Sequence, residues 1–152
     1  MKNKYYTPSI EEFHVGFEYE AEEIVESGTS MYWEKYIFEK NDSLELLFKV
    51  NDWYSLPRVK YLDKKDIESL GFKEETIPNC FKEDSLNQGY LKDINEKESL
   101  LLHYSGETKK LFLSKQVVYN EATDNWYTDF LFQGSIKNKS EFKKLLRQLN
   151  IN

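Results

Sequence analysis

The sequence predicts an α+β fold: a single domain over residues 1–152, with an antiparallel sheet of about six or seven strands in two meanders, a short middle helix and a C-terminal amphipathic helix. Three observations predict it. The length of 152 residues fits one domain with a sizeable core. The apolar bulk is mostly aromatic, with 11 Tyr, 10 Phe and 3 Trp, and such residues favour strands. Apolar and polar residues also alternate along several segments, whereas clear helix signatures appear in only two.

Residues 11–22 (EEFHVGFEYEAE) alternate most strictly and are predicted to form the central strand of the sheet. The apolar side of this strand carries Phe13, Val15, Phe17, Tyr19 and Ala21. The polar side includes His14, Glu18, Glu20 and Glu22. Burial of each larger apolar side chain contributes roughly 1.5 to 3 kcal/mol before conformational entropy is subtracted, so this strand can nucleate a core.

The rest of the first meander follows two turn sequences. An SGTS turn precedes an alternating strand at residues 31–40, and an NDS turn precedes a third strand predicted at residues 44–50. Residues 1–10 are predicted to form an edge or an arm ahead of the meander.

The strongest helix signature begins at Asp63. This residue is placed to cap the helix, Asp66 has the spacing that closes a capping box, and Gly71 is predicted to end the helix. The charged residues 73–89 that follow show no period and are predicted to form a long loop, a kind of segment that is often functional.

The second meander is predicted from the alternation that resumes after this loop. Its strands are expected at residues 90–94, 99–104, 110–119 and 126–134. The chain then continues into an amphipathic helix over residues 140–149, capped by Asn138 or Ser140. The side of this helix that is predicted to cover the sheet carries Phe142, Leu145, Leu146 and Leu149.

Two segments near the ends of the chain, KYYTPSIEEFHVGFEYE and FQGSIKNKSEFKKLLRQL, resemble small hypothetical proteins of bacteriophages and mobile elements in Bacteroidota. A composition rich in Lys and Asn and poor in Ala agrees with this resemblance. The resemblance implies a context and no activity, so it assigns no catalytic residue. Short phage accessory proteins of this kind act more often by binding than by catalysis, and some resemble proteins that disarm host defence.

Charge and cysteine content exclude several classes of protein. The net charge of −6, from 27 acidic and 21 basic residues, argues against duplex nucleic acid as a partner. The single cysteine, Cys80, cannot form an intramolecular disulfide. Because the start of the chain lacks a signal-peptide pattern and no apolar run approaches the ~18 residues of a membrane span, a cytoplasmic location and no membrane contact are expected.

No pattern in the sequence pairs a reactive group with an activator, so the preferred interpretation is that the protein is not an enzyme. The chain has no GxSxG, P-loop or GxGxxG motif. Cys80 has acidic neighbours that disfavour a thiolate, and His103 is interpreted as a structural or surface residue.

The acidic side of residues 11–22 keeps one enzymatic alternative open. His14, Glu18, Glu20 and Glu22 combine an imidazole with carboxylates, which can hold Mg²⁺ or Mn²⁺. A row along one strand diverges, however, unless a neighbouring strand supplies further ligands. A solvated polar face is therefore the preferred interpretation, with no metal site and no cofactor.

A candidate ligand site lies in residues 53–61 (WYSLPRVKY), where aromatic and basic side chains interleave. The candidate ligand-binding residues are Trp53, Tyr54, Arg58, Lys60 and Tyr61. Their rings can stack on a base, and Arg58 and Lys60, two apart on an extended segment, can reach a phosphate. The alternative is that the aromatic residues belong to the core and the two cations to the surface.

These observations favour a non-enzymatic, phage-type accessory protein that binds a host protein, such as a component of host defence, because exposed Tyr and Trp anchor protein interfaces. Two alternatives stay open. One is a sponge for a nucleotide signal at Trp53, Arg58 and Lys60, where a homodimer would double the cations around one ligand. The other is a metal-dependent enzyme that uses the acidic face of residues 11–22.

Overall fold

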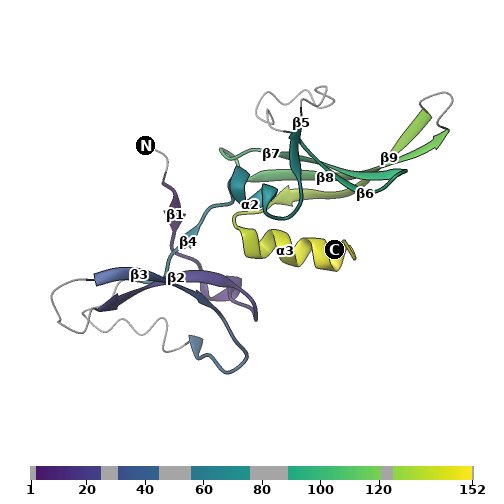
Figure 1. Cartoon of the computed structure of the whole chain (residues 1–152). Helices are drawn as coiled ribbons and strands as arrows, with labels where there is room; N and C mark the ends of the chain where they lie inside the picture. The colour runs from purple at the N-terminus through teal and green to yellow at the C-terminus, as the bar shows by residue number, and fades with distance from the viewer. Residues whose placement is uncertain (1–2, 25–30, 45–55, 76–88, 121–124, 152) are drawn as a thin grey trace. The chain divides into compact units, whose positions relative to one another are not determined.

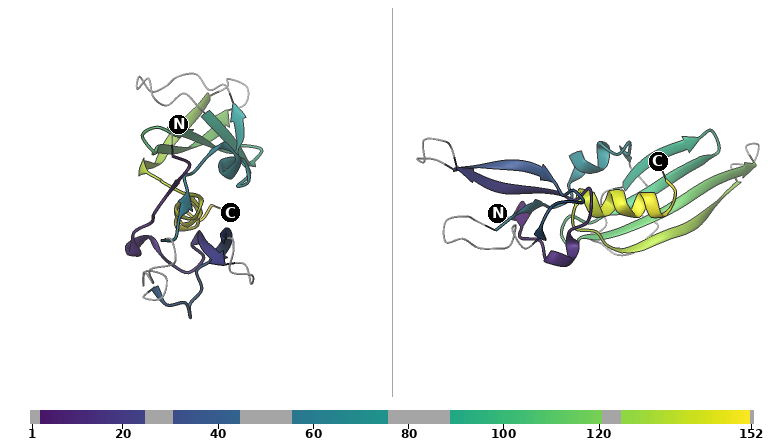
Figure 2. Two further views of the ribbon diagram at one scale, coloured as in Figure 1. Left: turned by 90° about the vertical axis from the view of Figure 1, so that its left-hand side faces the viewer. Right: turned by 90° about the horizontal axis from the view of Figure 1, so that it is seen from below.

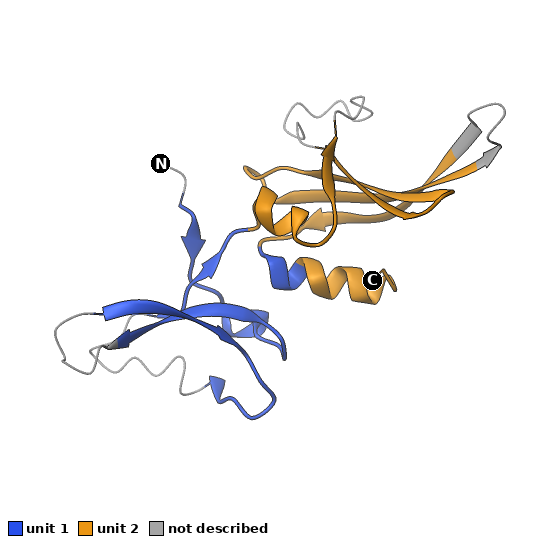
Figure 3. Ribbon diagram, viewed as in Figure 1, with its two compact units in different colours: residues 1–61, 138–141 blue, residues 62–137, 142–152 orange. Residues whose placement is uncertain are grey.

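The structure, a computed structural model, describes residues 3–24, 31–44, 56–75, 89–120 and 125–151. Within them lie nine strands, two α-helices and a 3₁₀ helix, which confirms the α+β prediction (Figure 1). The chain divides into two compact units (Figure 3). Unit 1 comprises residues 1–61 and 138–141, and unit 2 comprises residues 62–137 and 142–152. A single domain over residues 1–152 stays a prediction.

The described strands form three antiparallel sheets, so the prediction of one sheet with six or seven strands is wrong. The strands of unit 1 are β1 (Tyr5–Tyr6), β2 (Glu18–Ile24), β3 (Met31–Ile37) and β4 (Val59–Lys60). The strands of unit 2 are β5 (Lys73–Glu75), β6 (Gly89–Asn95), β7 (Glu98–Tyr104), β8 (Lys110–Asn120) and β9 (Asn125–Ser135). Unit 1 pairs β1 with β4 and β2 with β3, whereas unit 2 has one five-stranded sheet in the order β5-β6-β7-β8-β9.

The second meander and the C-terminal helix are confirmed in unit 2. From Phe142 onward, the helix α3 (Lys139–Gln148) runs along one face of the five-stranded sheet (Figures 1 and 2). The core between helix and sheet contains Leu100, Leu102, Leu111, Leu113, Phe142, Leu145 and Leu146. The strand residues in this core alternate along β7 and β8, because successive side chains of a strand point to opposite faces.

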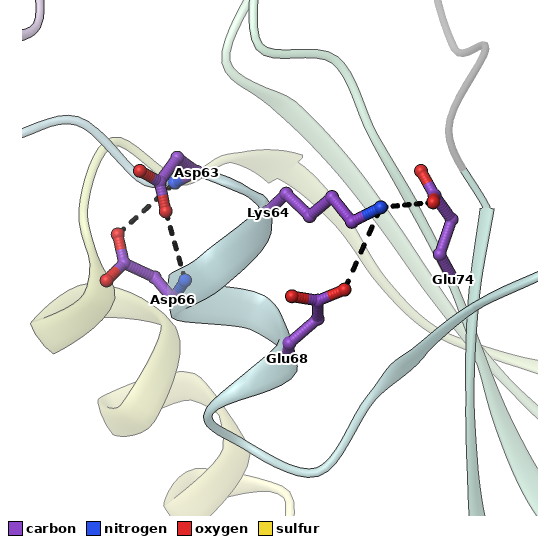
Figure 4. A network of polar contacts seen from close by, with 5 residues as sticks. All are labelled: Asp63, Lys64, Asp66, Glu68 and Glu74. Carbon is purple, nitrogen blue, oxygen red and sulfur yellow. Dashed lines mark hydrogen bonds and ion pairs between the residues drawn. The ribbon is translucent and has the colours of Figure 1, made fainter.

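The helix α2 (Lys64–Glu68) begins at its predicted cap (Figure 4). The Asp63 carboxylate accepts a hydrogen bond from the Asp66 backbone N–H at 3.0 Å, and the Asp66 carboxylate accepts one from the Asp63 N–H at 3.3 Å. The helix ends at Glu68, and its C-cap is Ser69 rather than the predicted Gly71. Gly71 instead supplies the backbone φ of +88° that leads the chain towards β5, a conformation that glycine adopts without a Cβ clash.

The loop predicted at residues 73–89 is partly wrong. Lys73–Glu75 forms the edge strand β5, and Gly89 is the first residue of β6. Residues 76–88 lie outside the described part of the chain. The strand was missed because its three residues are all charged and exposed, so no apolar alternation marks it. Lys64 of α2 forms an ion pair with Glu74 of this strand and lies 3.8 Å from Glu68 (Figure 4).

Unit 1 has an aromatic core of its own. It contains Phe13, Phe17, Tyr19, Phe38 and Val59. The Phe13 ring is at the centre of this core, with centroid distances of 4.7 Å to Phe17, 5.4 Å to Tyr19 and 5.5 Å to Phe38. Such tilted and edge-on arrangements are the ones that aromatic pairs prefer.

The central strand predicted at residues 11–22 is wrong in its bounds and in its place. Its first residues belong to a 3₁₀ helix, η1 (Ile10–Glu12), and the chain turns at Gly16, where φ is +88°. The strand therefore starts at Glu18 and runs to Ile24, in a two-stranded sheet with β3. The third strand predicted at residues 44–50 lies outside the described residues from position 45 onward.

Leu145→Asp should unfold unit 2. The Leu145 side chain is buried in the core under α3, and an unpaired carboxylate there should cost at least about 4 kcal/mol of unfolding free energy. Chemical denaturation followed by circular dichroism measures the loss. Lys144→Asp, which places the same side chain at the adjacent exposed position, is the control and should stay close to the parent. Equal stability of the two variants would mean that α3 is not docked.

Unfolding free energy should fall as the pH is lowered from about 6.5. His103 of β7 is buried, and this burial lowers the pKa of its imidazole. The imidazole of the unfolded chain therefore binds a proton at a pH where that of the folded chain does not. The contribution of His103 to the unfolding free energy is fully present above the ordinary histidine pKa and decreases as the pH falls below it. One such proton corresponds to at most about 1.4 kcal/mol per pH unit.

Denaturation curves between pH 5 and pH 8 on the parent and on His103→Gln measure this effect. The variant removes the titrating group, and its stability should be less sensitive to pH across that interval. An unchanged pH profile in His103→Gln would contradict the assignment to His103.

Candidate functional site

Arg58 is held in place by the backbone of β2. The Glu20 N–H donates to the Arg58 carbonyl oxygen at 2.9 Å, and the Arg58 N–H donates to the Glu20 carbonyl oxygen at 2.9 Å. This antiparallel bridge adds the segment before β4 to the open edge of β2. Because paired residues in antiparallel strands project their side chains to the same face, the bridge also brings the two side chains together.

The Arg58 guanidinium is bound by a carboxylate and lies between two aromatic rings. Its Nε and Nη2 atoms each lie 2.9 Å from Oε2 of Glu20. The guanidinium carbon lies 3.8 Å from the Trp33 ring centroid and 4.1 Å from that of Tyr5. A planar cation suits this double stack, which a lysine ammonium cannot reproduce. We call Tyr5, Glu20, Trp33 and Arg58 the Arg58 cluster.

The Arg58 cluster stands on one face of the sheet formed by β2 and β3. The register pairs Glu18 with Ile37, Glu20 with Lys35 and Glu22 with Trp33. These six residues and Met31 therefore lie on the same face, which we call the Arg58 face. The opposite face carries Tyr19 and Tyr36, whose rings stack at 5.6 Å beside the core of unit 1.

Two large apolar side chains on the Arg58 face are exposed to solvent. Met31 is 52% exposed and Ile37 is 60% exposed, one at each end of β3. Between them, the cluster is largely covered, since the Arg58 side chain is 28% exposed and that of Glu20 is 13% exposed. The face therefore combines a largely covered polar and aromatic centre with an accessible apolar margin.

The structure describes three of the five predicted ligand-site residues, Arg58, Lys60 and Tyr61. Arg58 joins the cluster on one side of its extended segment, and Lys60 pairs with Tyr5 in the β1-β4 ladder. Tyr61 alternates to the other side, where its ring stacks on Tyr6 at 4.7 Å. Arg58 and Lys60, two residues apart on the extended segment, therefore project to the same side, and ligand binding by the predicted residues stays a prediction. Trp53 and Tyr54 lie outside the described residues.

Sequence reasoning missed the residues that hold Arg58. Tyr5 and Trp33 come from strands separated from Arg58 by many residues, and no local spacing relates them. Glu20 was identified only as one member of an acidic row. The opposite charge of Glu20 was the one available signal, but several other carboxylates in unit 1 offered the same charge.

The acidic row is only partly reproduced. Glu18, Glu20 and Glu22 share the Arg58 face as predicted. His14 does not belong to the row, because it precedes the turn at Gly16. Across the described residues, no group of three His, Cys, Asp or Glu side chains is placed to hold a metal ion. The charge of Glu20 is instead compensated by Arg58.

The two other chemical candidates do not form a described pair. Cys80 lies outside the described residues. His103 is buried in β7, where the register places it beside Phe112 of β8 and Gly89 of β6. The prediction of a structural histidine fits this location.

No protein-family model matches the chain, and neither the curated proteins nor the solved structures contain a match. Among the described residues, no helix combines the length and the apolar character that a membrane span requires.

Arg58→Lys should destabilise unit 1 by about 1 to 3 kcal/mol, because the ammonium keeps the charge but loses the planar stack on two rings. Glu20→Gln should also destabilise it, and a double-mutant cycle should give a coupling of at least about 0.5 kcal/mol between the two positions. Thermal and chemical denaturation measure these values. Glu34→Ala, at an exposed position on the opposite face of β3, is the control. A cycle that closes without coupling would show that the contribution of the Arg58 guanidinium does not depend on the Glu20 carboxylate.

Proposed function

We propose that this protein acts without catalysis, by binding another protein through the Arg58 face. The observation that carries the proposal is the Arg58 cluster, in which Trp33, Tyr5 and Arg58 are held in one arrangement at the centre of a sheet face with an exposed apolar margin. Trp, Tyr and Arg are the residues that dominate binding energy at protein interfaces. Their rotamers are already restricted, so binding loses less side-chain entropy.

The margin of the Arg58 face supports the same function. Met31 and Ile37 offer apolar area on either side of the cluster, and an apolar margin can exclude water from the centre of an interface. Among the charged residues of the face, Glu18 and Glu22 favour a partner that presents basic groups.

The partner that we propose is a host protein, and a component of host defence fits best. This part of the proposal is supported by the resemblance of the terminal segments to proteins of phages and mobile elements. A protein of that kind gains by occupying a host protein stoichiometrically, which requires an interface and no catalytic group.

A capture experiment from Bacteroidota lysate, followed by calorimetry on the purified partner, tests the proposal. Ile37→Asp should weaken binding at least about tenfold, because it places a carboxylate in the apolar margin. Tyr32→Asp is the matched control: Tyr32 is also exposed on β3 but lies on the opposite face. Equal effects of the two substitutions would remove the Arg58 face from the interface.

The alternative function, binding of a nucleotide signal, makes a different prediction for Arg58. A bound nucleotide at a hundredfold excess over its dissociation constant should add about 2.7 kcal/mol of stability, and Arg58→Ala should abolish that gain. The carboxylate of Glu20 already occupies two nitrogens of this guanidinium, which is why protein binding is the preferred function. A nucleotide-induced rise in melting temperature that depends on Arg58 would reverse this preference.

A further inference from the structure

The two edges of the five-stranded sheet in unit 2 differ in length and charge. One edge is β5, with three residues, Lys-Glu-Glu, all charged and exposed. The other is β9, with eleven residues, NWYTDFLFQGS, of which only Asp129 is charged and none is proline. Short strands, charges and prolines are the usual means by which proteins protect a sheet edge from pairing with another chain. The β5 edge has this protection throughout, whereas the longer β9 edge has one charge, Asp129, and two register shifts in its pairing with β8.

The β9 edge exposes large aromatic side chains on both faces of the sheet. Phe130 is 67% exposed and Tyr127 is 48% exposed. The register pairs Phe130 with Ser114 and Tyr127 with Val117. Because Ser114 and Val117 are an odd number of residues apart on β8, the two aromatic side chains lie on opposite faces. A strand added beside β9 would therefore cover one aromatic residue on each face.

The backbone of β9 has groups directed away from β8. The Ser105 N–H donates to the Lys110 carbonyl oxygen at 2.9 Å, so Lys110 directs its backbone groups towards β7. Along a strand, the backbone N–H and C=O groups of successive residues point to opposite neighbours, so those of Ser114, four residues after Lys110, also point towards β7. Phe130 is the cross-strand partner of Ser114, so its backbone N–H and C=O point away from β8. Those of Thr128 point the same way, whereas those of Asp129 point towards β8. Within the described residues, β8 is the one strand that pairs with β9.

A row of alternating charges ends at this edge. The Lys115 ammonium lies 2.6 Å from the Glu98 carboxylate, and Asp129 of β9 is the cross-strand partner of Lys115. The charges thus run acid, base, acid across β7, β8 and β9 on one face. The exposed Asp129 carboxylate is the last of them, so a cation on an added strand would continue the alternation and an anion would oppose it.

We propose that the β9 edge binds an extended segment of a partner protein as a sixth, antiparallel strand. The segment carries Lys or Arg opposite Asp129 and apolar residues beside Phe130 and Tyr127. Backbone hydrogen bonds to Thr128 and Phe130 supply the affinity, and the charge and the two aromatic residues supply the selectivity. This surface belongs to unit 2 and is independent of the Arg58 face, so either can fail without the other.

The test uses the full chain and a synthetic probe, acetyl-Thr-Val-Thr-Val-Lys-Val-Val-Val-Thr-amide, with a twin in which Lys is replaced by Glu. Amide hydrogen exchange measured by NMR should show that the Lys peptide protects the N–H groups of Thr128 and Phe130. The Lys peptide should bind about fivefold more tightly than the Glu peptide, the effect of about 1 kcal/mol for a cross-strand charge pair. Asp129→Lys should reverse this preference.

Thr128→Pro removes one outward N–H without removing a bond to β8, and an edge strand tolerates such a proline. It should abolish peptide binding, while Thr128→Val, which keeps the N–H, should not. Three results would overturn the proposal: no protection at Thr128 and Phe130, undiminished binding by folded Thr128→Pro, or an unchanged preference in Asp129→Lys. Protection that rises with protein concentration alone would assign the edge to a second copy of this chain instead.

Discussion

The side chain of Asn138 hydrogen-bonds two separate parts of unit 1 directly and reaches a third through the Tyr6 hydroxyl. Asn138 is 1% exposed, and its amide oxygen accepts the Glu141 N–H at 2.9 Å, which caps α3. Its amide nitrogen donates to the Tyr6 hydroxyl at 2.7 Å, and that hydroxyl donates to the Glu12 carboxylate at 2.6 Å. A buried amide that lost one of these partners would leave an unpaired polar group, at a cost of about 1 to 3 kcal/mol. The β1 arm, η1 and the start of α3 therefore depend on one side chain.

The Arg58 cluster shows how one set of contacts can serve both stability and binding. Two backbone hydrogen bonds and a carboxylate hold Arg58 in place, and Arg58 in turn restricts the rings of Tyr5 and Trp33. Surface aromatic residues without such support would have to be ordered on binding. In unit 1 these rings lose their conformational entropy when the protein folds. Binding of a partner therefore loses less entropy, and more of the contact energy appears as affinity.

Local periodicity was sufficient where an element packs on one side. The residues that face α3 recur at every second position of β7 and β8, and the apolar stripe of α3 repeats at helical spacing for the same reason. The cap at Asp63 was predictable because it needs only a carboxylate and a spacing of three residues. These features depend on neighbours in the sequence, and a sequence displays them directly.

Features that depend on one backbone angle or on distant partners could not be predicted in this way. The apolar alternation of residues 11–22 continues through Gly16, and only its positive φ shows that the strand begins later. The division into three sheets depends on which strands pair, and Tyr5 and Trp33 meet Arg58 through that pairing. Alternation shows that a strand exists but does not select its partner, so the predicted site contained Arg58 without the residues that hold it.

The composition of unit 1 has a consequence for the order in which the chain assembles during synthesis. The Glu18 N–H donates to the Ser140 hydroxyl across 122 residues of sequence, and the capping amide of Asn138 comes from the same late segment. A ribosome releases the N-terminal residues first, at about 5 to 20 residues per second. The first part of the chain to emerge must therefore wait for residues 138–141 before its polar groups are satisfied, whereas the strands of unit 2 are neighbours in sequence and can pair as they appear. The N-terminal unit thus receives two of its polar partners last, although its aromatic core lies wholly within residues 13–59.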